Sequence, residues 1–268
     1  MHRNSWRLAT TLIVVVVVAC RPEFQLKKFT DNVALYTASS REFQRGKWDN
    51  AVAGFEKLTT ELPARDTLLP RSFWYLASAH QRLKEYLLAA QSFNRIVETF
   101  PEDTLADDSA LEAARSYRRL WRRPELDPTY GETAFATYNT LLALYPDSPL
   151  LPQAKAELDT LNDWFARKNY ITGMYYFRRK GYDSGNIYFK DILLKWPDSP
   201  TARQAGVKLV ESYRAIRYTA DATELCGQLR AKYPEARDVA DVCRDVPIAT
   251  VSPADSASAP RKPPTPTR

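Results

Sequence analysis

The segment from Phe73 to Pro101, FWYLASAHQRLKEYLLAAQSFNRIVETFP, predicts two amphipathic helices joined by a tight turn. Apolar residues recur at helical spacing in both halves, and Pro101 ends the second half because proline cannot continue a helix. Small residues fall where two helices must approach closely, and aromatic residues fall where a gap must be filled. This alternation is the tetratricopeptide pattern, in which one hairpin cannot bury its own apolar face. The segment therefore predicts neighbouring hairpins.

Repetition along the chain supplies those neighbours. A phenylalanine precedes a proline by eight residues in three places, at Phe55, Phe93 and Phe189. Tyr138 and Cys226 hold the equivalent place before two further prolines. We predict an all-α fold of five tetratricopeptide-like helical hairpins stacked in a right-handed superhelix, an α-α solenoid, with a generic helical bundle as the alternative. The expected repeats are 32–63, 71–101, 107–146, 150–197 and 200–234, followed by a capping helix at 235–246.

Two of these repeats depart from the regular pattern. The third contains Pro124 and Pro128 between its helices, so we expect an irregular excursion there. The fourth has no proline between Pro152 and Arg179, which predicts a long helix or two nearly continuous ones.

Both ends of the chain lie outside the predicted repeat domain. Residues 1–19 combine basic residues with a short apolar run, which is typical of a secretory signal peptide. The sequence Val17-Val18-Ala19-Cys20 resembles a bacterial lipobox, in which Cys20 becomes the lipidated first residue; an ordinary signal peptide with a chance cysteine is the alternative. Residues 20–31 would form the lipidated cysteine and its tether, and the proline-rich tail 247–268 is expected to be disordered.

The charge of the chain gives no reason to expect nucleic-acid binding. The formal net charge is +6, but four of these charges come from the signal and the tail, through Arg3, Arg7, Arg261, Lys262 and Arg268 against Asp255. No metal-site, nucleophile-elbow, phosphate-loop or paired-cysteine motif occurs. His80 falls at an interhelix position and is expected to be a packed core residue. We therefore predict a protein that is not an enzyme, with no metal or cofactor site.

Two cysteines remain besides Cys20. Cys226 and Cys243 are seventeen residues apart, on the last repeat helix and the presumed capping helix. That spacing suits a disulfide between adjacent antiparallel helices in an oxidising compartment. Two buried free thiols are the alternative.

A binding surface is expected on the first helices of the N-terminal hairpins. Arginine forks to carboxylates and aromatic rings supply contact area, so this surface would suit a peptide with an aromatic side chain and a carboxylate. Packing of half these residues between repeats is the other interpretation. The candidate groove residues are Tyr36, Phe43, Arg71, Trp74, Ser78 and Arg82.

Several longer segments are similar to the BamD/ComL family of outer-membrane assembly lipoproteins. They are RGKWDNAVAGFEKL at 45–58, ELDPTYGETA at 125–134, YPDSPLLPQAKAEL at 145–158 and FARKNYITGMYYFRRKGYDSG at 165–185. The resemblance covers residues 20 to about 235. It excludes the tail, and Tyr182 to Gly185 lacks the alanine pair common in the family at that place.

The resemblance implies a non-enzymatic scaffold of the β-barrel assembly machinery on the periplasmic side of the outer membrane. The anchor in the membrane lipid would be an N-acyl chain and an S-diacylglycerol on Cys20. Its C-terminal repeats would dock on the POTRA region of BamA, and its N-terminal repeats would meet unfolded outer-membrane β-barrel proteins. Arg21 follows Cys20 in place of the aspartate that retains lipoproteins at the inner membrane. Two alternatives are a tetratricopeptide lipoprotein that coordinates cell-envelope or division machinery, and a periplasmic chaperone.

Overall fold

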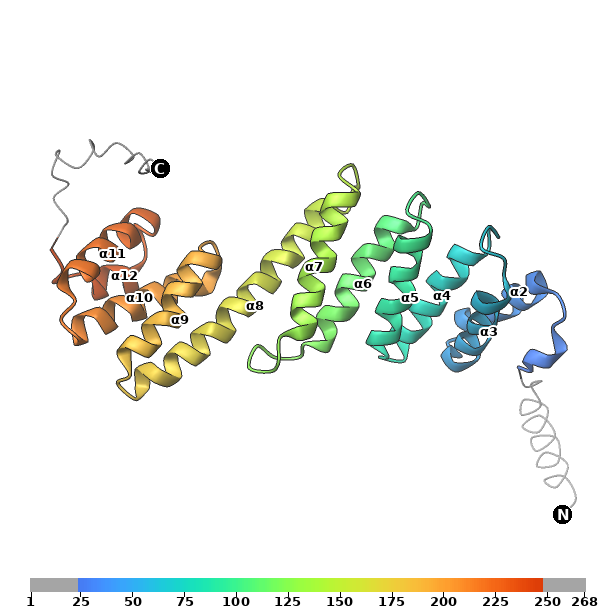
Figure 1. The fold of residues 1–268 in the computed structure, drawn as a ribbon, viewed down its shortest axis with the longest axis horizontal. Coiled ribbons are helices and arrows are strands. Elements are labelled where there is room, and N and C mark those ends of the chain that lie inside the picture. The colour runs from blue at the N-terminus through green and yellow to red at the C-terminus, as the bar shows by residue number, and fades with distance from the viewer. Residues whose placement is uncertain (1–23, 248–268) are drawn as a thin grey trace, which may run out of the picture. The chain divides into compact units, whose positions relative to one another are not determined.

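The computed structural model describes residues 24–247, and within this range all regular structure is helical (Figure 1). This confirms the predicted all-α fold of helical hairpins. None of the described helices is both long enough and apolar enough to cross a membrane. The elements are η1 (Leu26–Lys28), α2 (Asn32–Gln44), α3 (Trp48–Glu61), α4 (Leu69–Arg82), α5 (Tyr86–Thr99), α6 (Ala106–Leu120), α7 (Thr129–Leu144), α8 (Leu151–Arg178), α9 (Tyr182–Lys195), α10 (Pro200–Ala215), α11 (Thr219–Lys232) and α12 (Arg237–Val242).

The described residues divide into two compact units. Unit 1 comprises residues 24–122 and 129–155, and unit 2 comprises residues 123–128 and 156–247. The predicted repeat bounds stay a prediction. The predicted signal peptide, Cys20 with residues 21–23 of its tether, and the tail beyond Pro247 lie outside the described residues. The right-handed superhelix, a property of the whole array, stays a prediction.

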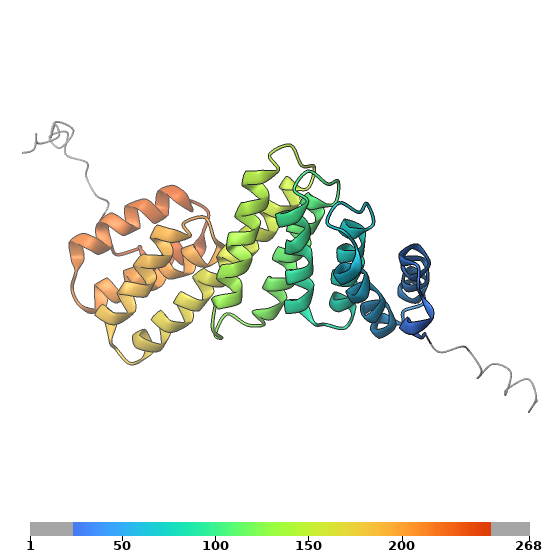
Figure 2. The ribbon, with the colours of Figure 1, turned by 45° about the vertical axis from the view of Figure 1, so that its right-hand side comes forward.

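Each hairpin of unit 1 is closed by a fully buried aromatic ring on its second helix. Phe55 on α3, Phe93 on α5 and Tyr138 on α7 are all 0% exposed. These are the residues that precede a proline by eight positions. The helices of unit 1 lie antiparallel and side by side (Figure 2). Phe55 packs with Leu76 and Phe93 packs with Ala113, and in each case the partner comes from the next hairpin.

The turn inside a hairpin has the same backbone geometry in four places. Gly46, Lys84, Lys180 and Arg217 all have φ between 61° and 75°, in the left-handed region. At each one the next amide donates to a carbonyl five residues back, as Lys47 does to Glu42 at 2.9 Å. This is the C-terminal capping arrangement that glycine favours, yet three of the four positions hold a lysine or arginine.

The first of these turns is also fixed by a buried carboxylate. Glu42 accepts hydrogen bonds from Asn50 at 2.7 Å and from Arg45 at 3.1 Å, and Lys47 lies 3.6 Å away. Burial by itself raises the pKa of Glu42, but these hydrogen bonds and the two nearby cations outweigh it and hold the pKa below its ordinary value. The ionised carboxylate therefore joins the end of α2 to the start of α3.

The third hairpin replaces this turn by a loop from Trp121 to Pro128, as its two prolines indicated. Trp121 is 2% exposed and packs directly against Gly131 at the start of α7. A β-carbon at Gly131 would lie 2.2 Å from the indole ring, so only glycine fits beneath it. The loop thus closes without the left-handed turn.

The proline-free part of the fourth repeat is one long helix, α8, which confirms the first of the two alternatives. Gly173 on α8 lies against the buried ring of Phe189 on α9. Asp163, also on α8, accepts hydrogen bonds from the amide and the hydroxyl of Thr201 in the first turn of α10, at 3.1 and 2.7 Å. A carboxylate is favourable at the N-terminal end of a helix, so Asp163 fixes α10 against α8.

A pair of glycine substitutions tests the left-handed turn. Gly46→Ala should destabilise the protein by about 1 kcal/mol, because alanine is disfavoured at positive φ while its methyl group would meet only Trp48 at 3.6 Å. Gly227→Ala should instead stabilise it by about 0.8 kcal/mol, since Gly227 lies within α11 with nothing near its missing methyl group. Thermal unfolding followed by circular dichroism measures both; shifts of the same sign would contradict this account of the turn.

Candidate functional site

The six candidate groove residues lie on the first helices of the first two hairpins in unit 1. Tyr36 and Phe43 come from α2, and the other four come from α4. On α4 the residues Arg71, Ser78 and Arg82 are seven and eleven positions apart, so they share one face of the helix over about 16 Å. Both arginine side chains are exposed, whereas Ser78 is half-buried.

The aromatic members on α2 are held in a ring cluster. The ring of Phe43 lies 5.2 Å from that of Tyr75 and 5.0 Å from that of Trp48, and the ring of Tyr36 lies 6.1 Å from Tyr75 and 5.8 Å from Phe55. Tyr36 and Phe43 are half-buried in consequence. They form one wall beside α4, with only part of each ring open to a ligand.

Trp74 lies on the other side of α4, towards the second helix of its own hairpin. Its ring meets that of Phe93 edge-on, with 5.1 Å between centroids, and it packs on the small cluster that includes Ala113 of α6. Trp74 is half-buried there. The exposed strip of α4 is therefore bounded by Tyr75 on the α2 side and by Trp74 on the α6 side.

Arg71 and Arg82 mark the two ends of this strip. The Arg82 guanidinium lies 5.6 Å from the centre of the Trp48 ring, and this cation–π contact leaves its donors open. Burial raises the pKa of Tyr36, with a smaller contribution from Tyr75, while the charge of Arg71 lowers it. The Tyr36 phenol is therefore a neutral hydrogen-bonding group near the Arg71 end.

Gln81 closes the gap between α4 and α6. Its amide donates to Glu112 and to Ser116 of α6, both at 2.9 Å. The amide nitrogen of Gln81 is therefore used in hydrogen bonds between the two helices and is not open to a ligand. It nevertheless fixes the spacing of the two helices on which the strip depends.

This arrangement is suited to binding a carboxylate next to an apolar group. The two exposed guanidinium groups can donate hydrogen bonds to carboxylates, and the flanking rings offer apolar contact area. His80 is 4% exposed, and its Nδ1 lies 2.8 Å from a carboxylate oxygen of Glu85, so it secures the α4–α5 turn. Among the described residues, no group of three or more potential ligands is placed to hold a metal ion.

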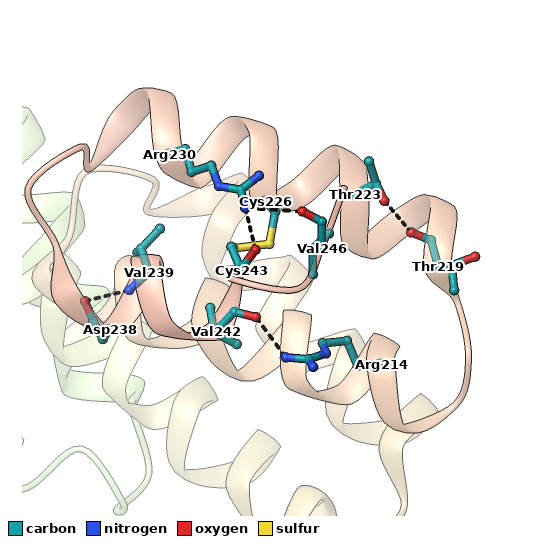
Figure 3. Close-up of a disulfide and its surroundings, with 10 residues drawn as sticks. All are labelled: Arg214, Thr219, Thr223, Cys226, Arg230, Asp238, Val239, Val242, Cys243 and Val246. Atoms are coloured by element: carbon teal, nitrogen blue, oxygen red, sulfur yellow. Dashed lines mark hydrogen bonds between the residues drawn. A yellow bond between two sulfur atoms is a disulfide. The ribbon is translucent and has the colours of Figure 1, made fainter. Parts of the chain in front are cut away.

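The other predicted pair, Cys226 and Cys243, is joined in the structure by a disulfide with 5.7 Å between the Cα atoms (Figure 3). Arg230 donates to the carbonyl groups of Cys243 and Val246, and Arg214 donates to that of Val242 at 3.0 Å. The bridge closes a loop of seventeen residues, and restricting the unfolded chain in this way contributes about 3 kcal/mol. The short helix α12 is thereby fastened to α10 and α11.

Unit 2 also contains a cavity of about 670 Å³ between α8, α10 and α12. Its floor is formed by Tyr170, Val207 and Val242, and charged residues line its rim. These charges largely satisfy one another, since Lys208 holds Glu211 at 2.8 Å. No converging set of unpaired polar groups indicates a small-molecule ligand here.

Some residues that shape these surfaces were missed in the sequence. Tyr75 is central to the ring cluster, but the predicted groove contained its neighbour Trp74 instead. Trp48 lies under Arg82 through a contact between two hairpins, which helical spacing does not reveal. Asp163 and Thr201 are 38 residues apart, and no motif in the sequence links them.

Two similar proteins belong to the family that the quoted segments resemble. The chain is 23% identical to the outer membrane protein assembly factor BamD of Caulobacter vibrioides over 210 residues, covering 78% of this chain and 68% of that protein. It is 24% identical to the protein of that name from Vibrio cholerae serotype O1 over 209 residues, covering 75% and 86%.

Similar solved structures have tetratricopeptide repeats but resemble the chain only loosely. The TPR2AB domain of yeast Sti1 gives a TM-score of 0.38 at 14% identity, covering 80% of this chain and 83% of that one. A tetratricopeptide protein of Thermus thermophilus gives 0.35 at 16% identity, covering 78% and 95%.

A family model gives the broadest match. The family YfiO, described as outer membrane lipoprotein, matches residues 29–241, which is almost all of the part that the structure describes. The match runs from the segment before α2 to α12 and so includes both units. The chain therefore belongs to the YfiO family of outer membrane lipoproteins, the family that includes the BamD assembly factors.

Proposed function

We propose that this protein is a non-enzymatic scaffold of the outer-membrane β-barrel assembly machinery. It acts in the periplasm and is held at the outer membrane by an N-acyl chain and an S-diacylglycerol on Cys20. The observation that carries this proposal is the family match over residues 29–241, because it includes all five hairpins and the irregular loop at 121–128. A scaffold needs surfaces for partners, and each unit offers one.

In the proposed scheme, unit 1 receives unfolded β-barrel proteins on the exposed strip of α4. The two exposed arginines are about 16 Å apart along the helix, a length that about five residues of extended peptide can span. A C-terminal carboxylate would bind one guanidinium group as a charge-assisted pair. An aromatic side chain of the same peptide would rest against the partly open rings of Tyr36 and Phe43.

Unit 2 docks on the POTRA region of BamA. The two most exposed large apolar side chains among the described residues are Leu194 and Ile187, at 79% and 68%, and both lie on α9. They are seven residues apart and therefore share one face of that helix. Exposed apolar residues grouped on one face are typical of protein-binding surfaces.

The peptide site is tested with a fluorescent peptide whose last residue is a phenylalanine with a free carboxylate. Arg71→Glu combined with Arg82→Glu should weaken its binding at least tenfold, because a hydrogen bond to a charged group contributes about 1.5–3 kcal/mol. Fluorescence anisotropy measures the affinity. Arg65→Glu with Arg95→Glu makes the same change of charge on exposed residues outside the strip and should leave the affinity within about twofold.

The peptide itself supplies a second control. Its C-terminal amide lacks the carboxylate and should bind the unmodified protein as weakly as the free-acid peptide binds the double variant. Equal affinity of the two peptides for the unmodified protein would reject the carboxylate site on α4.

The docking surface is tested by purification from detergent-solubilised membranes. Ile187→Glu with Leu194→Glu should abolish recovery of BamA, because two carboxylates would have to be buried without partners. Leu87→Glu with Leu88→Glu, on exposed positions of α5 in unit 1, should leave recovery unchanged. Full recovery of BamA with the α9 variant would exclude this face as the docking surface.

A further inference from the structure

The first helix of each hairpin in unit 1 ends in a basic turn. Arg41 lies in the last turn of α2, and Arg118 and Arg119 lie in the last turn of α6. Lys84 follows α4 in the left-handed turn, and Arg122 follows α6. We call the exposed residues Arg41, Lys84, Arg119 and Arg122 the basic edge.

Contacts between hairpins place these turns next to one another. Arg82 at the end of α4 stacks on Trp48, which begins α3 just after the first turn. Arg119 at the end of α6 stacks in the same way on Tyr86, which begins α5 just after the second turn, at 5.3 Å. Figures 1 and 2 show the turns of the three hairpins on one side of unit 1. The hairpin ends that carry the basic residues therefore lie next to one another along this side of unit 1.

The opposite side of unit 1 carries the other sign of charge. It consists of the loops that join one hairpin to the next and of the first turn of α6. These segments contain Asp66, Glu102, Asp103, Asp107 and Asp147, against one exposed arginine, Arg65. The hydroxyl of Ser148 donates to Asp107 at 2.7 Å, which brings the third of these loops to the start of α6. Unit 1 is thus basic along one edge and acidic along the other.

Internal interactions do not account for the basic edge. Within residues 24–247, Arg41, Lys84, Arg119 and Arg122 take part in no salt bridge. The first helices end at this edge, where cations stabilise them. The second helices begin at the same edge, where anions would stabilise them instead. Their first turns hold one acidic residue in α3, none in α5 and one in α7. The edge keeps an excess of positive charge that capping does not require.

The start of the described chain approaches this edge. Lys57 of α3 donates to the carbonyl of Phe29 at 3.4 Å, and the Phe24 ring lies beside Gly54 one turn earlier on α3. Phe29 thus lies near Lys57, and Phe24 lies near Gly54, which is closer to the start of α3 at Trp48. Followed backwards from Phe29 to Phe24, the chain approaches the basic edge. Cys20 is four residues before Phe24, and four residues span at most about 14 Å.

We propose that the basic edge of unit 1 binds the anionic headgroups of the membrane in which the Cys20 lipid is embedded. This proposal rests on the lipidation of Cys20, which belongs to the proposed function. Each basic side chain near an anionic bilayer strengthens binding roughly fivefold, an effect that decays over about 8 Å at physiological salt. The acidic side is repelled, so the first helices would stand with their C-terminal ends towards the lipid, and the α4 strip would run away from the membrane from Arg82 to Arg71.

Vesicle binding by the full mature chain tests the edge without the anchor. Residues 20–268 with Cys20→Ser would be sedimented with vesicles of phosphatidylethanolamine and phosphatidylglycerol, and with vesicles of phosphatidylcholine alone. We expect binding only to the anionic vesicles, with a steep decrease as salt is raised. Adding Arg41→Glu, Lys84→Glu and Arg122→Glu should weaken partitioning at least about thirtyfold.

A matched variant separates the edge from net charge. Arg65→Glu, Arg95→Glu and Lys155→Glu change the charge of unit 1 by the same amount at exposed positions away from the basic edge. This variant should lose less than about fivefold. The proposal would be overturned if both variants lost vesicle binding equally. It would also be overturned if the unmodified protein did not prefer anionic vesicles. An edge variant that binds vesicles normally but loses a protein partner would overturn it as well.

The anchor is checked separately by mass spectrometry of the N-terminal peptide from membranes. An unmodified Cys20 together with intact vesicle binding would contradict the anchor alone and leave the edge assignment standing. A lipidated Cys20 with vesicle binding unaffected by the edge substitutions would reject the edge and leave the anchor intact.

Discussion

A hairpin of two amphipathic helices cannot bury its own apolar face, and the rest of this structure depends on that constraint. Three second helices present a fully buried ring that packs on the next hairpin: Phe55, Phe93 and Phe189. Burying a side chain of this size contributes about 1.5–3 kcal/mol, so stacking is the main source of stability within each unit. Because stacking uses one face of each first helix, the opposite face stays free for partners.

The sequence was sufficient to predict the elements that depend on nearby residues in the chain. The apolar spacing and the proline eight residues after each buried ring predicted the hairpins, and Pro124 and Pro128 predicted the irregular loop. The left-handed turns at Lys84, Lys180 and Arg217 could not be predicted, because these residue types do not favour positive φ. The division into two units depends on contacts between helices, which no sequence periodicity describes.

The candidate site was predictable in part for the same reason. Arg71 and Arg82 follow from helical spacing alone, and both are exposed as expected for a binding surface. Tyr36 and Phe43 were placed in the groove, but their rings are shared with Tyr75, a contact between hairpins that the spacing did not reveal. The disulfide between Cys226 and Cys243 closes the array at its other end, where α12 covers the last hairpin. Both units keep exposed side chains on helix faces, Arg71 and Arg82 in unit 1 and Ile187 and Leu194 in unit 2.

The most direct measurement of the proposed role in outer-membrane assembly is the abundance of many outer-membrane β-barrel proteins after the protein is depleted from its own cells. Quantitative proteomics of isolated outer membranes would give this, with inner-membrane proteins as the internal reference. The account predicts that most β-barrel proteins decrease together before division or cell-wall defects appear. Unchanged β-barrel levels alongside an early division defect would contradict it.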